Sequence, residues 1–386
     1  MTCLILDAHL HSALSTVRSL GKKNSKIFSA SDTRLAPSFF SRYSVKNFLY
    51  PSPLKDESAF IKKITSILES LKDDCLIYIF SETTLLPLSR NRNKLPKNTR
   101  LILGSLENVE LASDKAATLT LAAENNIPIP QTFFPGSFAE AQNFLSKIPY
   151  PCIVKPRHNC VWKDGASVYE TAHLVETKEE AEKIWRELFN ASGEPPLIQE
   201  RVVGEERGIF TFAVKGEGFA WFAHKRLESL KKLGGASILR ESIEVDPKLK
   251  SYSELLIKKL DWTGPLMIEW KWDENAKRYL LMEINARFWG SLPLAVASGV
   301  DYPALMLDFA VGQSLPNEVT YKISIRSRHF FGALRSLLRA KTWRDFQKLW
   351  QIMWGEKTID DVFSFSDPLP FLGEVLFIGK TFIWKK

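Results

Sequence analysis

Two neighbouring apolar segments each contain one carboxylate that the residues around it would bury. Leu266–Trp272 contains Glu269, and Arg278–Ile284 contains Glu283 fourteen residues later. Two strands joined by the short polar turn between them would place both carboxylates side by side. A buried carboxylate is costly unless it is paired or bound to a metal. This spacing favours a cation site over the alternative that both are ordinary acids at strand edges.

An amide and a cation extend this pattern beyond Glu283. Alternate side chains of a strand share a face, so Glu283, Asn285 and Arg287 are expected to point the same way. Carboxylate and amide oxygens suit a hard cation such as Mg²⁺, and a guanidinium clamps a phosphate or carboxylate. After Gly290, an apolar helix is expected over Leu292–Ala297, ending at Gly299.

Two lysines could supply further anion contacts. Lys155 ends the buried strand Pro151–Pro156, where the alternative is a lysine that reaches back to the surface. Lys115 lies in the first turn of a helix predicted over Ser113–Asn125, with Ser113 as its N-cap. A cation there opposes the helix dipole, so an anionic ligand would explain it better than solvent does.

The elements that must position these residues fall into two patterns. Strand and helix alternate over the first ~110 residues, which predicts a small doubly wound α/β domain. Its first turn, Asp7–Ser12, lacks the glycines of a dinucleotide site. The segment Ser38–Pro53 is expected to be irregular. From 113 to 315 the pattern is mixed α+β, with a hairpin at Gly208–His224 and a glycine-containing loop at Ser229–Ser237.

Five short motifs occur in an order and spacing that resemble the ATP-grasp superfamily, nearest to its carboxylate-amine ligase and carbamoyl-phosphate-synthase-like branch. They are Asp114-Lys115, Ile153–Pro156, Leu197–Val202, Met267–Glu269 and Leu281–Arg287. The resemblance covers roughly residues 1–315. It implies an N-terminal pre-ATP-grasp domain (1–112), an ATP-grasp domain of two α+β subdomains that clasp ATP (113–315), and a mostly helical, basic and aromatic C-terminal extension (316–386).

The resemblance also implies roles for individual residues. The two lysines, Lys115 and Lys155, would contact the phosphates of ATP, and Arg287 would stabilise the transferred phosphoryl group. The implied magnesium ligands are Glu269, Glu283 and Asn285, with Mn²⁺ as an alternative ion. The remaining ATP contacts would be Gln199, Glu200 and Val202 at the adenine and Glu206 at the ribose. The chain departs from the family pattern in having Arg207 where the ribose acid is usual, and a single Gly165 in the phosphate loop Arg157–Ala166.

The acceptor substrate is the least determined part of this interpretation. In the superfamily the region after the hairpin faces the acceptor, and here it carries His224, Arg226 and Arg240. A basic group of this kind suits a carboxylate or acyl-phosphate; the alternative is a solvated cationic strand edge. No Ser-His-Asp or Cys-His arrangement is present, so no covalent enzyme nucleophile is expected.

The expected function is therefore an ADP-forming ligase that phosphorylates a small-molecule carboxylate and joins it to an amine. Two alternatives stay open. One is a nucleotide-binding scaffold or regulator without ligase activity. The other is bicarbonate chemistry of the carboxylase or carbamoyl-phosphate type, which is less favoured because the chain has no biotinyl-carrier-like or glutaminase segment. The identity of the substrates and the oligomeric state are left open.

Composition sets the remaining expectations. The chain has 386 residues and a net charge of +8, and the segment 321–350 alone contains eight Lys/Arg and one acid. That basic, aromatic C-terminal part could contact an anionic membrane or a partner protein, or could pack on the body as a helix over Arg335–Met353. No nucleic-acid motif is present. Four cysteines without a Cys-x-x-Cys pair, no N-terminal signal and no ~20-residue apolar run predict a cytoplasmic protein.

Overall fold

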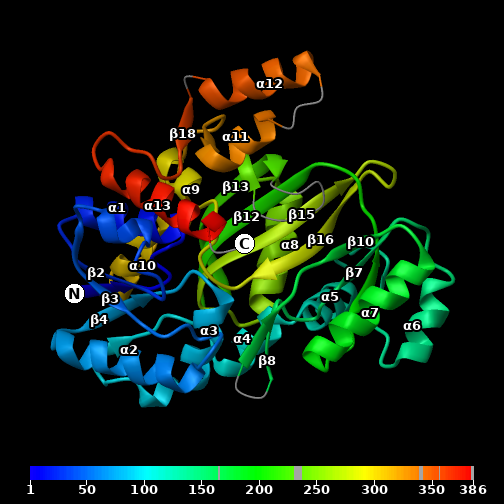
Figure 1. The fold of residues 1–386 in the computed structure, drawn as a ribbon, viewed down its shortest axis with the longest axis horizontal. Helices are drawn as coiled ribbons and strands as arrows, with labels where there is room; N and C mark the ends of the chain where they lie inside the picture. Colours follow the sequence, from blue (N-terminus) through cyan, green and yellow to red (C-terminus); the bar gives the residue numbers. More distant parts are fainter. Residues whose placement is uncertain (164–165, 230–236, 339–341, 356, 384–386) are drawn as a thin grey trace.

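The computed structural model describes residues 1–163, 166–229, 237–338, 342–355 and 357–383 (Figure 1). Its strands form a five-stranded sheet, a four-stranded sheet, a seven-stranded sheet and one separate hairpin. Gly165 and almost all of the predicted loop Ser229–Ser237 lie outside the described residues. The α/β and α+β fold class expected from the sequence is confirmed.

The N-terminal sheet is parallel throughout, in the order β3-β2-β1-β4-β5. Its strands are β1 (Thr2–Ile5), β2 (Lys26–Ser31), β3 (Ser44–Leu49), β4 (Cys75–Tyr78) and β5 (Thr99–Arg100). Alternate residues of β1 face opposite helix layers. Leu4 packs in the core that contains α2 (Glu57–Leu71), whereas Cys3 and Ile5 pack in the core that contains α1 (His11–Lys22). This two-sided burial is the doubly wound arrangement that the sequence predicts.

Two predictions in this region were wrong. Ser44–Leu49 was expected to be irregular, but it forms the edge strand β3, whose half-exposed residues carry no continuous apolar signal. The helix predicted over Ser113–Asn125 is observed as α5 (Lys115–Glu124), but Ser113 is not its N-cap, because it ends the preceding helix α4 (Leu106–Ser113). Asp114, not Ser113, caps α5, because its carboxylate accepts hydrogen bonds from the N–H groups of Ala116 and Ala117. A third helix, α3 (Glu82–Arg90), follows β4.

The middle of the chain builds the four-stranded sheet, with two helices packed against it (Figure 1). The strand order is β10-β7-β11-β6, all antiparallel. The strands are β6 (Thr132–Phe133), β7 (Cys152–Lys155), β10 (His173–Val175) and β11 (Leu197–Glu200), and the helices are α6 (Phe138–Leu145) and α7 (Lys178–Ser192). The segment after β7 forms the separate hairpin of β8 (Cys160–Lys163) and β9 (Ala166–Tyr169).

The seven-stranded sheet has the order β16-β15-β12-β13-β14-β17-β18. Its first five members come from one continuous stretch of chain: β12 (Glu206–Val214), β13 (Glu217–Ser229), β14 (Ser237–Ile243), β15 (Gly264–Asp273) and β16 (Arg278–Asn285). Helix α8 (Pro247–Lys259) connects β14 to β15. After β16, α9 (Leu292–Ser298) and α10 (Tyr302–Ala310) pack in the core shared with α1 and β1. The predicted hairpins at β12–β13 and β15–β16 are both observed.

The C-terminal segment completes this sheet and returns to the N-terminal domain. β17 (Arg326–Arg328) pairs with β14, and β18 (Thr358–Asp360) pairs with β17. The single helix predicted over Arg335–Met353 was wrong, because two helices occur there, α11 (Phe330–Leu338) and α12 (Trp343–Trp354). The last helix, α13 (Leu369–Ile383), lies beside α1 (Figure 1). Within the described residues, no helix is long and apolar enough to cross a membrane.

Candidate active site

The hairpin of β15 and β16 places Glu269 directly opposite Glu283. From Glu283 a chain of hydrogen bonds follows the strand end. Asn285 donates from Nδ2 to Oε1 of Glu283 at 3.2 Å, and Arg287 donates to Oδ1 of Asn285 at 3.1 Å. The three side chains that were expected to share a face therefore contact one another. The Nε of Arg287 is buried and has no hydrogen-bond partner among the described residues.

Two lysines lie across from this group. Lys155, at the end of β7, is only 6% exposed, and its Nζ donates to Oε1 of Gln199 at 3.0 Å. Lys115 begins α5, and its Nζ donates to Oδ1 of Asn159 at 2.9 Å. The main chain holds the two lysines together, because the N–H of Lys115 donates to the carbonyl of Arg157 at 3.1 Å, just beyond β7.

The charges of these residues perturb one another. Burial, followed by the positive charge of Lys115, lowers the pKa of Lys155 to about 8. Burial opposes ionisation of Glu283, but Lys115 and Lys155 outweigh it and lower the pKa of that carboxyl. Burial and the charge of Glu283 raise the pKa of Glu269 to about 7. Two carboxylates that repel each other inside a buried site fit a bound divalent cation, which would relieve the repulsion.

The residues predicted to contact adenine lie on β11 and just after it. Gln199 is buried and links Lys155 to Thr132. Its Oε1 accepts a hydrogen bond from Lys155, and its Nε2 donates to the Thr132 hydroxyl at 2.8 Å. The carboxylate of Glu200 accepts a hydrogen bond from the N–H of Gln131 at 2.8 Å. Val202 is buried beyond the strand. Gln199 and Glu200 thus lie on the strand that pairs with β7, which carries Lys155.

Glu206 and Arg226 connect this site to the central strands. Arg226 lies 2.8 Å from a carboxylate oxygen of Glu206 and 3.5 Å from one of Glu269. Lys271 donates to the other oxygen of Glu206 at 3.0 Å. A recess of about 170 Å³ opens here, and its lining includes His224. Both carboxylate oxygens of Glu206 are thus paired with cations, Arg226 and Lys271. Its contact with a ribose stays a prediction.

The structure does not bring all three predicted acceptor residues together. His224 lines the recess but is buried against Phe210, and burial together with the charges of Arg240 and Arg226 holds the pKa of His224 well below its usual range. Arg240 is 2% exposed and forms an ion pair with the buried Asp361 of the C-terminal segment. Of the three, only Arg226 contacts the acids of the site.

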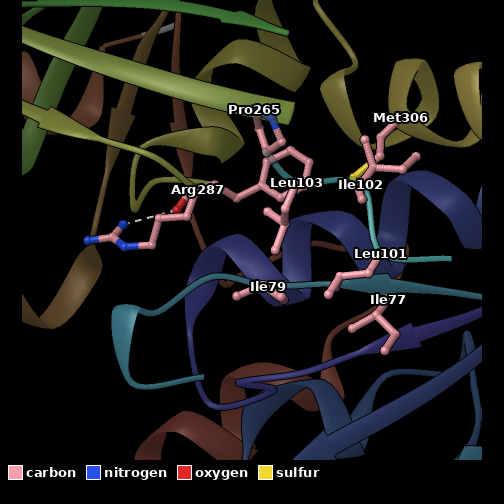
Figure 2. A pocket seen from close by; sticks show the side chains of 9 residues that line it. Ile77, Ile79, Leu101, Ile102, Leu103, Pro265, Arg287 and Met306 are labelled. Carbon is pink, nitrogen blue, oxygen red and sulfur yellow. Dashed lines mark hydrogen bonds between the residues drawn. The ribbon is translucent and has the colours of Figure 1, made fainter. Parts of the chain in front are cut away.

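Sequence reasoning missed one acid near this site. Glu82, the first residue of α3, lies 3.7 Å from the guanidinium of Arg287. It comes from the N-terminal domain and belongs to no recognisable motif. A further recess, of about 220 Å³, lies between that domain and β15 and is lined by apolar residues (Figure 2). Arg287 also lines this recess, but its guanidinium points away from the apolar side chains and donates to the Phe288 carbonyl at 3.0 Å.

Comparison with known proteins gives one family match. The family described as "ATP-grasp in the biosynthetic pathway with Ter operon" matches residues 193–330. Among curated relatives, the carbamoyl phosphate synthase large chain of Clostridium acetobutylicum is 28% identical over 281 residues, 70% of this chain and 25% of its own length. The arginine-specific large chain of Bacillus subtilis is 23% identical over 69% of this chain and 26% of its own. The chain thus spans about a quarter of these relatives.

Solved structures share the fold over most of the chain. A biotin carboxylase from Campylobacter jejuni superimposes with a TM-score of 0.65, at 17% identity, over 84% of this chain and 74% of that one. N5-carboxyaminoimidazole synthetase from Staphylococcus aureus gives 0.59 at 14% identity, over 83% and 79%. An L-amino acid ligase from Bacillus licheniformis gives 0.59 at 16% identity, over 82% and 75%.

Proposed function

This chain is a member of the ATP-grasp superfamily, and from that premise we propose that it is an ADP-forming ligase that joins a small-molecule carboxylate to an amine. One observation carries the proposal. Glu269 lies opposite Glu283, the charges of Lys115 and Lys155 act on Glu283, and the buried Nε of Arg287 has no partner among the described residues. Acidic oxygens, buried cations and an unsatisfied guanidinium donor together fit a metal-bound polyphosphate.

In this proposal each residue keeps the role that the family resemblance implies. Lys115 and Lys155 hold the phosphates of ATP, while Gln199, Glu200 and Val202 meet the adenine and Glu206 the ribose. Glu269, Glu283 and Asn285 would hold Mg²⁺, which when bound neutralises phosphate charge. We further propose the division into 1–112, 113–315 and 316–386, in which the N-terminal domain contributes Glu82 beside Arg287.

The reaction needs positioning and charge neutralisation more than enzyme nucleophiles. The γ-phosphoryl group passes to a carboxylate oxygen of the substrate, which forms an acyl phosphate and releases ADP. The amine then attacks the acyl carbon, the bond from that carbon to the phosphate oxygen breaks, and the amine loses a proton. Arg287 stabilises the transferred group, and Arg226, which lies 3.5 Å from Glu269, binds the acceptor.

The names of the structural neighbours favour a carboxylate over other acceptors. They include an L-amino acid ligase, and also carboxylases, one of them solved with bicarbonate. Both substrate classes present a carboxyl oxygen to the γ-phosphate. The four cysteines are buried and unpaired, which supports a reducing compartment such as the cytoplasm.

The test is release of ADP from ATP and Mg²⁺, measured across a panel of carboxylates with and without amines and with bicarbonate. Glu283→Gln is expected to lower the rate by roughly 10²-fold or more, the scale of losing one major electrostatic contact. Glu274→Gln is the matched control, because Glu274 lies in the turn of the same hairpin and pairs with Lys277 in solvent.

Three outcomes would count against the proposal. Near-normal ADP release by Glu283→Gln would remove the site assignment. ADP release that needs bicarbonate and no amine would replace the ligase by a carboxylase-type reaction. Nucleotide binding without turnover on any pair would favour a nucleotide-binding scaffold.

A further inference from the structure

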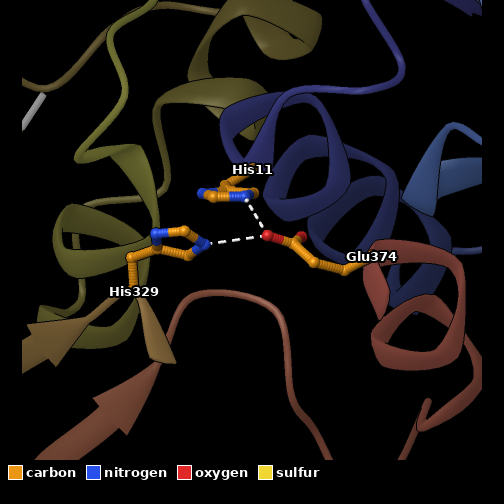
Figure 3. Close-up of side chains that lie close together, drawn as sticks. All are labelled: His11, His329 and Glu374. Atoms are coloured by element: carbon orange, nitrogen blue, oxygen red, sulfur yellow. Dashed lines mark hydrogen bonds and ion pairs between the residues drawn. The ribbon is translucent and has the colours of Figure 1, made fainter. Parts of the chain in front are cut away.

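A second cluster of ligand-type side chains lies away from the proposed ATP site. His11 is the first residue of α1, His329 follows β17, and Glu374 lies in α13. Both histidines point their Nε2 atoms at the same carboxylate oxygen of Glu374, at 3.0 Å from His11 and 2.8 Å from His329 (Figure 3). Three segments that are far apart in the chain therefore meet at one oxygen atom.

The hydrogen bonds inside the cluster leave it incompletely satisfied. Glu374 is 3% exposed, and its second oxygen, Oε2, is buried without a partner among the described residues. Oδ1 of the buried Asp361 is likewise unpartnered, and the charge of Asp361 acts on His11. A buried carboxylate oxygen without a donor is costly. Asp361 already has Arg240 as its partner, whereas Glu374 keeps one buried carboxylate oxygen free to bind a positive group beside the two imidazoles.

We propose that His11, His329 and Glu374 bind a divalent transition metal ion of the zinc type. Their three ligand atoms lie within 4.8 Å of one another. Tetrahedral zinc, with bonds of about 2.0–2.2 Å, separates its ligand atoms by about 3.3 Å. The two histidine-to-glutamate distances would have to open by about 0.3–0.5 Å, and the widest pair of ligand atoms, now within 4.8 Å, would have to close by up to about 1.5 Å, which side-chain rotations provide.

The donor set decides which class of metal fits. Two imidazole nitrogens and one carboxylate select zinc-like ions over magnesium, which prefers oxygen ligands. This cluster and the all-oxygen group of Glu269, Glu283 and Asn285 thus suit different ions. Both histidine side chains are about one-quarter exposed, so water can complete the coordination from the open side.

Such an ion would act as a clamp between the two ends of the chain. α13 already packs against the N-terminal domain, where Gly373 approaches the ring of Phe40 so closely that a Cβ would lie 2.5 Å from it. Asp367, just before α13, accepts hydrogen bonds from the Arg18 guanidinium and the Ser41 hydroxyl. The metal would add the end of β17, through His329, to this junction. The proposal is independent of the ligase function.

The experiment uses the full-length chain, stripped with a chelator and titrated with Co²⁺ and Zn²⁺. One equivalent of Co²⁺ is expected to produce the visible d–d absorption of a low-symmetry four-coordinate site, and Zn²⁺ is expected to displace it. His11→Asn and His329→Asn should each weaken binding by at least about tenfold, since replacing even a residue that only hydrogen-bonds to a metal ligand costs that much. His9→Asn is the control, because His9 hydrogen-bonds to Ser31 outside the cluster. This variant should bind Co²⁺ as the wild type does.

Two further measurements keep the result unambiguous. Zn²⁺ should raise the unfolding temperature of the wild type and of His9→Asn, but not that of His329→Asn. Glu283→Gln should retain the Co²⁺ absorption. The proposal is overturned if the wild type takes up no metal, if both cluster variants bind like the wild type, or if Glu283→Gln alone abolishes the absorption.

Discussion

Replacing Lys155 by methionine should leave the nucleotide-free protein at least as stable as the wild type at pH 7. Lowering the pKa of Lys155 from its ordinary 10.5 to about 8 means that burial of the cation costs the folded protein roughly 3 kcal/mol, at about 1.4 kcal/mol per pH unit. Methionine removes that cost. It also leaves Oε1 of Gln199 without its donor, which costs about 1–3 kcal/mol. The expected net change is a gain of about 0–2 kcal/mol.

The pH dependence of this difference gives the sharper prediction. Below pH 8 the lysine is charged in both the folded and unfolded states, so the burial cost is fully present. Between pH 8 and 10.5 the folded protein releases its proton first, and the unfolded chain binds more protons. The free energy of unfolding of the wild type should therefore rise relative to that of Lys155→Met, by up to about 1.4 kcal/mol per pH unit.

Urea unfolding of both proteins at pH 7, 8, 9 and 10, without nucleotide, measures this difference. Lys147→Met serves as the control at an exposed lysine, where a change within about 0.5 kcal/mol is expected. The reasoning is refuted if Lys155→Met is clearly less stable than the wild type at pH 7, or if its difference from the wild type stays constant from pH 8 to 10. If Mg-ATP stabilises the wild type against urea but not Lys155→Met, that result would separately support the proposed contact of Lys155 with the phosphates of ATP.

Two more predictions concern the C-terminal segment. Arg240→Met should destabilise the protein by about 3–5 kcal/mol in urea unfolding, because it leaves the carboxylate of Asp361 buried and unpaired. Adding Asp361→Leu should restore most of that loss, and no recovery would contradict the ion-pair explanation. Trp343 and Trp350 are 70% and 49% exposed on α12, beside the basic segment, so the chain should float with anionic vesicles and Trp343→Ser/Trp350→Ser should not. Equal flotation of both proteins would argue against this surface.

Local sequence patterns predicted much of the fold, because the interactions that form a helix or a hairpin act between residues close together in the chain. The apolar spacing of Phe60, Ile64 and Leu68 is typical of an amphipathic helix, and in α2 all three are buried. The turn after Asp273 determined the register of β15 and β16 as far as Trp270 and Leu281, and a β-bulge beyond Trp270 then shifted it so that Glu269 lies opposite Glu283. The predictions failed where the local signal was weak or shared, as in the half-exposed edge strand β3 and at Ser113, where the next residue makes the stronger cap.

The sequence by itself determined which residues could do chemistry and which strand or helix carries each of them. Tertiary structure alone decided which of them meet. It brought Lys115 and Lys155 to Glu283, and it placed Glu82 beside Arg287. It also buried Arg240 with Asp361 and joined His11, His329 and Glu374 across the two ends of the chain. These contacts depend on the packing of whole helices and sheets, whose free energy is summed over many side chains, and no short segment of the sequence encodes that sum.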